Sequence, residues 1–548
     1  MSLRGQLDES LRAGRNVLGN GALRSLQLAG LGSTLGTWAY SVALPVYAYH
    51  AGGARTVGII FFARFAAAAL CAPWLAVLAD RWSRRQVMLA ADVIRIGVIG
   101  GMAVLAFLHS PPLPIFVLAV CSTAVSSAFP PAQAALLPSL VTSPEELTSA
   151  NVVMNAIGSA SMFAGPALGG ALLAVSGPAA VFAANAGCFV WSAFHLLRVP
   201  RDERPATAEH ERVLPALVSG FRAVAHEPNL RLIMGLTGAQ TLVAGAFQVL
   251  MVVYVLRVLD AGNSGVGWLT SALGIGALVG AVAVAALAGR KRLAGDFGIG
   301  VLLWGLPIAL LATWANLGFA IVLVIVIGLG NTLVDVAGMT LLQRTTSDEV
   351  LGRVFGVLES LILATLAVGS LVAPAIIAGL GARPALLVVG LFLPALLVPL
   401  WVRLQRIDRA AAVATEPLAV LRELPMFAPL PAPALERLAG LAAAVSVPEG
   451  QPVFSQGDHG DRFYAIESGR AAVDVDGAQT RTLGPGDFFG EVALLRDVPR
   501  TATVRALDDL QLYAVERDDF IAVVTGHAPS LEAAESIVAT RVPLSAAI

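Results

Sequence analysis

Long apolar stretches fill most of the first 403 residues and leave few folds open to this chain. A helix needs about 20 mainly apolar residues to cross a bilayer, and about twelve stretches of that length can be read along the sequence. Only 13% of the residues are charged, whereas soluble domains contain about 25%. We therefore predict an all-α polytopic membrane domain of twelve helices, arranged as two groups of six, with the lipid bilayer as its surroundings.

Composition also divides the chain into segments. After the last apolar stretch, short β-type runs separated by glycines predict a small β-roll with flanking helices, closed by a helix near 529–541. The Ala-rich linker before it is compatible with either a continuing helix or a flexible segment. The predicted segments are an N-terminal segment (1–24), an N-terminal six-helix half (25–198), a central loop (199–229), a C-terminal six-helix half (230–403), a linker (404–416) and a C-terminal domain (417–548).

Basic residues predict which loops face the cytoplasm. If the segment 1–24 is cytoplasmic, the outer loops carry only the single arginines Arg55, Arg257 and Arg383, whereas the inner loops are rich in basic residues. An even number of spans then places both termini in the cytoplasm of a multi-pass protein of the plasma membrane. A net charge of −1 offers no basic surface, so we expect no nucleic-acid partner. The inner basic residues are Arg81, Arg84, Arg85, Arg198, Arg201, Arg204, Arg212, Arg222, Arg290, Lys291, Arg292, Arg344 and Arg353.

The two groups of spans repeat one another. Residues Ser143–Leu147 follow the fourth stretch as Ser347–Leu351 follow the tenth, and both segments begin with serine and contain acidic residues. Arg84 and Arg85 follow the second stretch as Arg290–Arg292 follow the eighth. Duplicated six-span halves are typical of secondary transporters, whose small-molecule site lies between the halves.

Residues 20–405 resemble the major facilitator superfamily. The family pattern G-x-x-x-D-R-x-G-R-R is matched after the second stretch, with Ala76 and Ser83 in place of the two glycines. The resemblance implies that the charged loop latches the two halves in one state, while the alternative is a solvated basic loop. The residues assigned to this latch are Asp80, Arg81, Arg84 and Arg85.

Glycines in the fifth stretch resemble a motif of the family's proton-coupled exporters. They are Gly158, Gly165, Gly169 and Gly170, with Pro166 between them. The resemblance makes export of a small molecule the expected direction. Because small residues also permit ordinary close packing of helices, that interpretation remains open.

Charged residues within the apolar stretches are candidates for transport or gating, because a charge in hydrocarbon is unfavourable. Asp92 and Arg95 are three residues apart and can pair on one helix face. We expect them to form, with Glu359, a charge network near the cytoplasmic gate. Family analogy places Asp335 on the central cavity, where it would bind a proton or a cationic substrate.

A short stretch near the C-terminus has the groups needed to hold a cyclic phosphate. Residues Phe489–Leu495 contain a glycine followed by an acid and small residues, and Pro499–Val504 contain an arginine. Small residues let backbone N–H groups turn towards an anion, an acid can accept a sugar hydroxyl, and an arginine can fork onto phosphate oxygens.

This region resembles the cyclic-nucleotide-binding family over Leu424–Val504. The resemblance implies that Arg500 binds the cyclic phosphate and that Glu491 accepts the ribose 2′-hydroxyl, aided by the Gly490 backbone. Ala493 and Ala502 would supply backbone N–H donors, and the final helix would cover the base, with Ile537 and Arg541 as candidates. The full predicted set is Phe489, Gly490, Glu491, Val492, Ala493, Arg500, Thr501 and Ala502.

The regulatory ligand expected from this resemblance is cAMP, with cGMP as the alternative because Thr501 follows the arginine. The leading functional hypothesis is a transporter regulated by that nucleotide. The alternatives are a membrane-anchored receptor without transport, and a transporter whose roll serves only oligomerisation. No nucleophile elbow, phosphate loop or metal-ligand spacing is found, so we expect no enzyme activity, no metal and no required cofactor.

Overall fold

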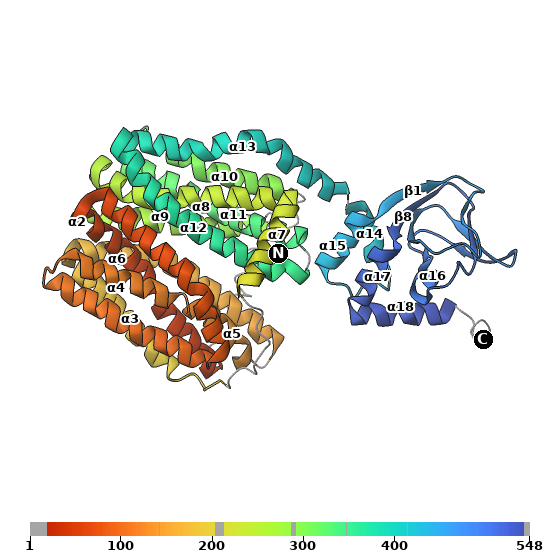
Figure 1. Ribbon diagram of the computed structural model, residues 1–548, viewed down its shortest axis with the longest axis horizontal. Helices are drawn as coiled ribbons and strands as arrows, with labels where there is room; N and C mark the ends of the chain where they lie inside the picture. Colours follow the sequence, from red (N-terminus) through yellow and green to blue (C-terminus); the bar gives the residue numbers. More distant parts are fainter. Residues whose placement is uncertain are drawn as a thin grey trace. The chain divides into compact units, whose positions relative to one another are not determined.

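The computed structural model of the chain describes residues 19–141, 143–202, 213–286, 292–346, 348–413 and 415–541 (Figure 1). Within these ranges, only the backbone is described for residues 73–74, 76–81, 144–145, 213–217, 285–286, 348–349, 409–413, 415 and 432–433. The chain separates into two compact units, Met1–Trp401 and Val402–Ile548.

The first unit is helical, as predicted. Among the described residues, ten helices are long and apolar enough to cross a membrane. Its elements are α2 (Gly21–Arg81), α3 (Arg84–Phe107), α4 (Pro112–Ser126), α5 (Phe129–Leu136), the 3-10 turn η1 (Leu137–Leu140), α6 (Pro144–Leu196), α7 (Val213–His226), α8 (Pro228–Val253), the π-turn η2 (Tyr254–Val258), α9 (Gly262–Ala286), α10 (Leu293–Leu310), α11 (Leu317–Thr345), α12 (Asp348–Leu380) and α13 (Ala382–Val413).

Two of these helices are interrupted at glycines. Helix α2 has 61 residues and is non-helical at Gly52 and Gly53, where Gly53 has φ +66°. Helix α6 has 53 residues and is non-helical at Gly177, with φ +77°. Positive φ is easily adopted only by glycine. Each interrupted helix is long enough for two spans. When both are divided at their kinks, the ten helices become twelve spans, the number that we predicted.

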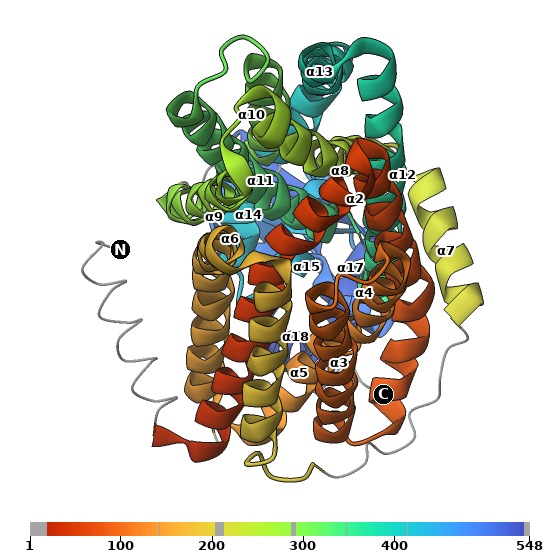
Figure 2. The same ribbon diagram turned by 90° about the vertical axis from the view of Figure 1, so that its left-hand side faces the viewer.

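The two halves of this unit form separate groups of helices, with α3 and α5 in the lower part of Figure 2 and α10 and α13 in the upper part. They approach closely where α6 crosses α9, because a Cβ on Gly170 would lie 2.9 Å from the Cα of Gly267. Close backbone approach of this kind requires small residues. His50 of α2 also hydrogen-bonds Asn263 of α9, at 3.0 Å between Nε2 and Oδ1.

The second unit contains the predicted roll and its helices. Two four-stranded antiparallel sheets have the orders β1-β8-β3-β6 and β2-β7-β4-β5. The elements are α14 (Thr415–Arg422), α15 (Ala432–Leu441), β1 (Ala443–Val447), β2 (Pro452–Phe454), β3 (Arg462–Ser468), β4 (Ala471–Val475), β5 (Ala478–Leu483), β6 (Phe488–Phe489), α16 (Glu491–Arg496), β7 (Thr503–Ala506), β8 (Leu510–Glu516), α17 (Arg517–Thr525) and α18 (Ala528–Arg541).

An aromatic core joins the helices to the roll. Phe463 of β3 stacks on Phe520 of α17 with ring centroids 4.8 Å apart, and Phe427 contacts both rings. All three side chains are fully buried. The linker that the sequence left open is helical as far as Val413, because α13 continues beyond the last apolar stretch.

Candidate cyclic-nucleotide site

The predicted cassette forms one continuous turn of the second unit. Strand β6 ends at Phe489, Gly490 has a left-handed conformation with φ +93°, and the short helix α16 begins at Glu491. The helix ends at Arg496, and the next residue, Asp497, is also left-handed with φ +53°. The chain then returns through Arg500 into β7. The short helix expected at Glu491 is therefore present.

Only glycine fits at position 490, for two independent reasons. Its positive φ is strained for any residue with a side chain. A Cβ there would also lie 2.7 Å from Nη1 of Arg500 and 2.9 Å from the carbonyl oxygen of Arg462. The glycine thus lets the guanidinium pack directly against the backbone at the start of α16.

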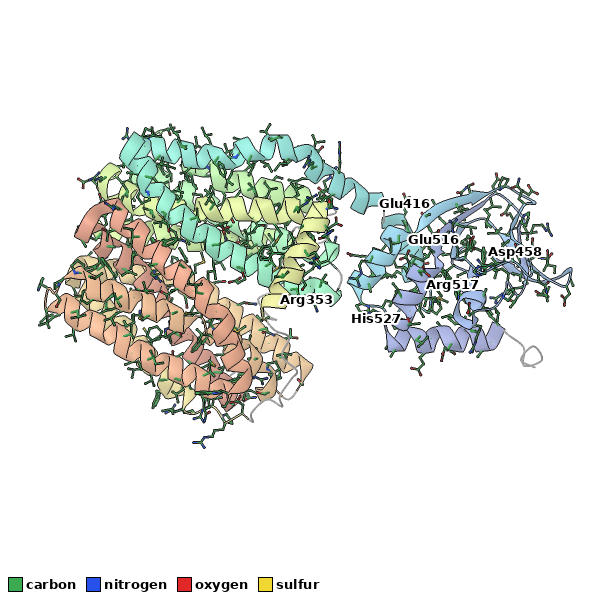
Figure 3. The ribbon with its side chains drawn as sticks, in the orientation of Figure 1. Arg353, Glu416, Asp458, Glu516, Arg517 and His527 are labelled. Carbon is green, nitrogen blue, oxygen red and sulfur yellow. The ribbon has the colours of Figure 1, made fainter. Side chains whose placement is uncertain are left out.

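Arg500 is almost completely buried, with 2% of its surface exposed. Nη1 donates to the carbonyl of Gly490 at 3.1 Å, and Nη2 donates to the carbonyl of Arg462 at 2.8 Å and to Oδ1 of Asp461 at 3.1 Å. The guanidinium carbon lies 4.1 Å from the ring centre of Phe454. The backbone N–H of Arg500 donates to the carbonyl of Asp458, a residue labelled in Figure 3.

Glu491 is also buried, with 1% of its surface exposed. Its Oε1 accepts a hydrogen bond from Nη1 of Arg541 at 2.9 Å, and the same Nη1 donates to the carbonyl of Phe488. Burial raises the pKa of the Glu491 carboxyl, and the positive charge of Arg541 offsets part of that rise.

Two buried polar atoms of this site are left without a partner among the described residues. One is Nε of Arg500, a donor, and the other is Oε2 of Glu491, an acceptor. Buried polar groups in native proteins are nearly always hydrogen-bonded, so these two atoms are available to a ligand or to water. A ligand that carries an anionic acceptor and a hydroxyl donor would satisfy both atoms.

The other predicted cassette residues surround these two. Phe489 stacks on Tyr464 at 5.2 Å between ring centroids, inside the roll. Ala493 is buried, Val492 and Ala502 are half-buried, and Thr501 is exposed. The roles assigned to their backbone N–H groups remain predictions.

The final helix contacts the cassette, and its role in covering the base stays a prediction. Ile537 packs against the hydrophobic core of the unit, and Arg541 binds Glu491. The arginine therefore reaches the position predicted to hold the ribose, because α18 runs back across α16. Asp461 was not among the predicted residues, and no motif distinguishes it in the sequence.

In the first unit, the charged loop after α2 is tied to the end of α6. Nε and Nη2 of Arg85 donate to the carbonyls of Leu196 and Leu197, both at 2.9 Å. In return, the carboxylate of Asp202 accepts hydrogen bonds from the backbone N–H of Arg84 at 2.7 Å and from the N–H of Arg85 at 3.2 Å.

These bonds join the loop to the end of α6 and to Asp202, which directly follows the N-terminal half. The side chains of Asp80 and Arg81 are outside the described part of the structure, so the latch between halves remains a prediction. Asp202, which no motif identified, caps the first turn of α3.

Among the described residues that were predicted as charged groups within the spans, Asp92 and Arg95 lie close together on α3. Nη1 of Arg95 lies 3.7 Å from Oδ1 of Asp92. Asp335 is exposed on α11 and accepts a hydrogen bond from Asn331 at 2.8 Å. Glu359 is exposed on α12. Because α12 belongs to the C-terminal half, Glu359 lies in the other half from Asp92 and Arg95.

Most of the glycines predicted in the fifth apolar stretch lie where α6 packs closely against other helices. A Cβ on Gly165 would lie 2.5 Å from the Cβ of Trp38, and one on Gly169 would lie 2.8 Å from the Cα of Ala39. Gly170 faces Gly267 of the other half, whereas no atom lies within 4 Å of a Cβ placed on Gly158. Three of the four glycines therefore permit close helix packing.

Comparison with protein families decides the class of the first unit. The model of the Major Facilitator Superfamily matches residues 26–295 and 236–454. The chain belongs to the Major Facilitator Superfamily. The chain also matches the family model of the cyclic nucleotide-binding domain at residues 444–527, which include the whole predicted cassette. It is thus a multi-pass membrane protein with a transporter domain and a C-terminal cyclic nucleotide-binding domain.

The curated relatives of this protein match its C-terminal domain. The chain is 40% identical over 102 residues to a cAMP-dependent protein kinase regulatory subunit of Yarrowia lipolytica, covering 18% of this chain and 27% of the relative. It is 36% identical over 104 residues to the corresponding subunit of Emericella nidulans, covering 19% of this chain and 25% of the relative. The chain thus spans about a quarter of the length of the curated relatives it matches.

Solved structures match the same region. The regulatory domain of Toxoplasma gondii PKA with cAMP is 29% identical, with a TM-score of 0.20, and the match covers 20% of this chain and 44% of that one. The Thermus thermophilus catabolite activator protein is also 29% identical, with a TM-score of 0.20 and coverage of 21% and 57%.

Proposed function

We propose that this chain is a secondary transporter that exports a small molecule, and that cAMP bound to its C-terminal domain regulates the transport. Regulation requires that the nucleotide bind the domain more tightly in one state of the transporter than in the other. A coupling free energy of about 1–3 kcal/mol corresponds to a difference in nucleotide affinity between the two states of roughly fivefold to 150-fold.

The observation that carries the nucleotide proposal is the pair of buried, unpartnered atoms in the cassette. Nε of Arg500 requires an acceptor and Oε2 of Glu491 requires a donor. A cyclic phosphate supplies the first and the ribose 2′-hydroxyl supplies the second. The choice of cAMP is supported by the relatives from Yarrowia lipolytica and Emericella nidulans, which are named as cAMP-dependent kinase subunits.

The proposed location is the plasma membrane, with both termini in the cytoplasm, where cyclic nucleotides are made. The support is the charge bias of the loops, since only Arg55, Arg257 and Arg383 lie on the side proposed to be outer. The exporter direction is supported by the glycines of α6, which resemble those of proton-coupled exporters.

The first experiment tests binding with the full-length protein in lipid nanodiscs. Isothermal titration with cAMP, cGMP and 5′-AMP should show binding of a cyclic nucleotide, tightest for cAMP, and much weaker binding of 5′-AMP. Arg500→Ala should abolish it. Arg505→Ala is the matched control, because Arg505 lies on the neighbouring strand and pairs with Asp474 at 3.8 Å. Absence of binding by all three nucleotides would reject the proposal.

The second experiment tests coupling and does not require the transported substrate to be known. All eight tryptophans lie before residue 402, at positions 38, 74, 82, 191, 268, 304, 314 and 401. A cAMP-dependent change of tryptophan fluorescence in the full-length protein therefore reports a response of the transporter domain. We expect such a change in the native protein and its loss in Arg500→Ala.

Transport itself is tested in cells that express the protein. Efflux of a panel of fluorescent small molecules should depend on cAMP in the native protein and not in Arg500→Ala. Nucleotide binding without a fluorescence change and without efflux would instead support the alternative of a membrane-anchored receptor.

A further inference from the structure

An arginine lies within the second span of the N-terminal half, at a depth where a charge is unfavourable. Arg64 is eleven residues beyond the interruption of α2 at Gly53, and a rise of 1.5 Å per residue places it about 16 Å along that span. This depth is near the middle of a hydrocarbon core about 30 Å thick. Charged side chains at such a depth are rare, and they mark substrate or ion pathways.

Arg64 is anchored through one of its three guanidinium nitrogens. Nε donates to Oγ1 of Thr123 on α4 at 2.8 Å, and this Oγ1 itself donates to the carbonyl of Ala119 at 3.0 Å. The hydroxyl proton of Thr123 is therefore used, and its oxygen is oriented to accept from Arg64. The bond through Nε is the only hydrogen bond that the Arg64 side chain makes to the described residues. Because the side chain is only half-buried, the fork formed by Nη1 and Nη2 is available to a ligand.

A buried tyrosine packs beside this arginine and also lacks a hydrogen-bond partner. The guanidinium carbon of Arg64 lies 5.4 Å from the ring centre of Tyr40, which belongs to the first span. Tyr40 is 4% exposed, and its hydroxyl has no partner among the described residues. Buried hydroxyl groups are normally hydrogen-bonded. Unused donors of two neighbouring side chains therefore come together where α2 meets α4.

The charge of Arg64 has no acidic partner. Asp92 is the only acidic residue in the six apolar stretches predicted for this half, and it lies beside Arg95, with 3.7 Å between Oδ1 and Nη1. Arg64 forms no ion pair within the described part of the chain. The N-terminal half thus carries an uncompensated positive charge inside the membrane, which a negatively charged ligand would neutralise.

Arg64 also lies on a helix that forms the contact between the two halves. A Cβ on Gly58, six residues earlier in α2, would lie 2.5 Å from the carbonyl oxygen of Ser370 on α12. Six residues of helix extend about 9 Å. Transporters built from repeated halves bind their substrate between the halves, near the middle of the membrane. The position of Arg64 is therefore suited to contact with a transported molecule.

We propose that Arg64 and Tyr40 bind the anionic group of the transported molecule, a carboxylate or a phosphate. Nη1 and Nη2 match two oxygen atoms of such a group end-on, because Nε is already held by Thr123. The hydroxyl of Tyr40 supplies a further donor. This inference rests on the proposed transport function and adds the substrate class to it, a small organic anion. It is independent of the nucleotide site.

The opposing hypothesis is a cationic substrate held by Asp335 in the C-terminal half. The carboxylate of Asp335 already accepts a hydrogen bond from Asn331 at 2.8 Å. The donors of Arg64 and Tyr40 are instead unused, so the N-terminal half offers the less satisfied group. Probes of opposite charge distinguish the two hypotheses.

Binding is tested by thermal unfolding of the full-length protein in detergent with four probes of similar size, which are benzoate, phenylphosphonate, benzamide and benzylammonium. At least one of the two anions should raise the Tm of the native protein, because a ligand that binds only the folded state stabilises it. The neutral and cationic probes should not. A response to benzoate or to phenylphosphonate separates a carboxylate from a phosphate as the preferred group.

Three variants test the residues. Arg64→Gln should abolish the shift in Tm, and Tyr40→Phe, which keeps the ring, should weaken anion binding by about tenfold. Tyr40→Phe also provides the test if Arg64→Gln fails to fold. Arg55→Gln is the matched control, because Arg55 is an exposed arginine of the same helix, and it should retain the full shift. The absence of any shift in the native protein would overturn the proposal, as would a shift that persists unchanged in Arg64→Gln and Tyr40→Phe.

Transport is tested with two dyes that share a ring system and differ in charge, 5-carboxyfluorescein and rhodamine 123. Cells that express the native protein should export the anionic dye, and cells that express Arg64→Gln should not. Export of rhodamine 123 alone, lost in Asp335→Asn, would overturn the proposal and leave the transport function intact. Export of neither dye would count against transport, while the Tm shifts still decide whether the anion site exists. Nucleotide binding should be unchanged in all these variants.

Discussion

Nη1 of Arg541 donates to Oε1 of Glu491 at 2.9 Å, so that the end of α18 is hydrogen-bonded to the carboxylate assigned to the ribose. The guanidinium carbon also lies 4.2 Å from the ring centre of Phe488. Oε2 of the same carboxylate stays free. Arg541 therefore holds Glu491 in place and leaves an acceptor for the ligand.

Arg541→Gln should weaken nucleotide binding by about tenfold, or 1.4 kcal/mol. Without the arginine the pKa of Glu491, already raised by burial, rises further. The ribose hydroxyl needs an ionised acceptor. As the pH is lowered, the variant should therefore lose nucleotide binding at a higher pH than the native protein does. Titration calorimetry at several pH values measures this. Arg470→Gln, which removes an exposed pair with Asp508, should leave binding unchanged.

Gly490→Ala should disrupt the site more than an equally strained glycine elsewhere. It combines a positive φ with a Cβ 2.7 Å from Nη1 of Arg500. Gly486→Ala is the control, because Gly486 has φ +83° but no atom within 4 Å of a Cβ. Both should lose about 1–3 kcal/mol of stability from backbone strain, and only Gly490→Ala should also lose nucleotide affinity. Equal affinities in the two variants would contradict this account of position 490.

Asp202→Ala should destabilise the first unit by about 0.5–2 kcal/mol, because it removes the cap of α3. Burial alone would raise the pKa of Asp202, but hydrogen bonds from Ser83 and from the N–H groups of Arg84 and Arg85 outweigh this and lower it below 3.8. Stability from a carboxyl with a lowered pKa is present above the unfolded value and is lost as the pH falls through the folded value.

The measurement for Asp202 is thermal unfolding of the native and variant proteins in detergent as a function of pH. The difference in Tm between them should be constant at neutral pH and should shrink at pH values below about 4. A difference that stays the same in acid would show that the carboxylate charge does not contribute.

Gly170→Val should disturb the contact between the two halves. The added side chain would meet the backbone of Gly267, and overpacking of this kind typically destabilises by about 1–3 kcal/mol. Gly158→Val is matched in sequence change and helix, but its Cβ meets no atom within 4 Å. The thermal stability in detergent should therefore fall more for Gly170→Val, and an equal loss in both would mean that helix propensity alone is responsible.

The sequence alone determined the two architectures and the cassette, because each is written in local pattern. Apolar stretches of membrane length fix helices in any bilayer, and the segment from Phe489 to Thr501 is nearly contiguous, so its residues meet through a single turn. Even the closing helix at 529–541 was predicted within one residue of α18, which begins at Ala528.

Tertiary structure decided which distant groups meet. Asp202 caps a helix more than one hundred residues earlier, Arg541 reaches Glu491 across fifty residues, and Arg95 bonds to α2 in preference to its neighbour Asp92. Sequence spacing predicts neighbours within a helix or a turn, but it carries no signal for contacts that arise when separate helices pack. Those contacts determine which buried atoms remain without a partner, and therefore where a nucleotide is proposed to bind.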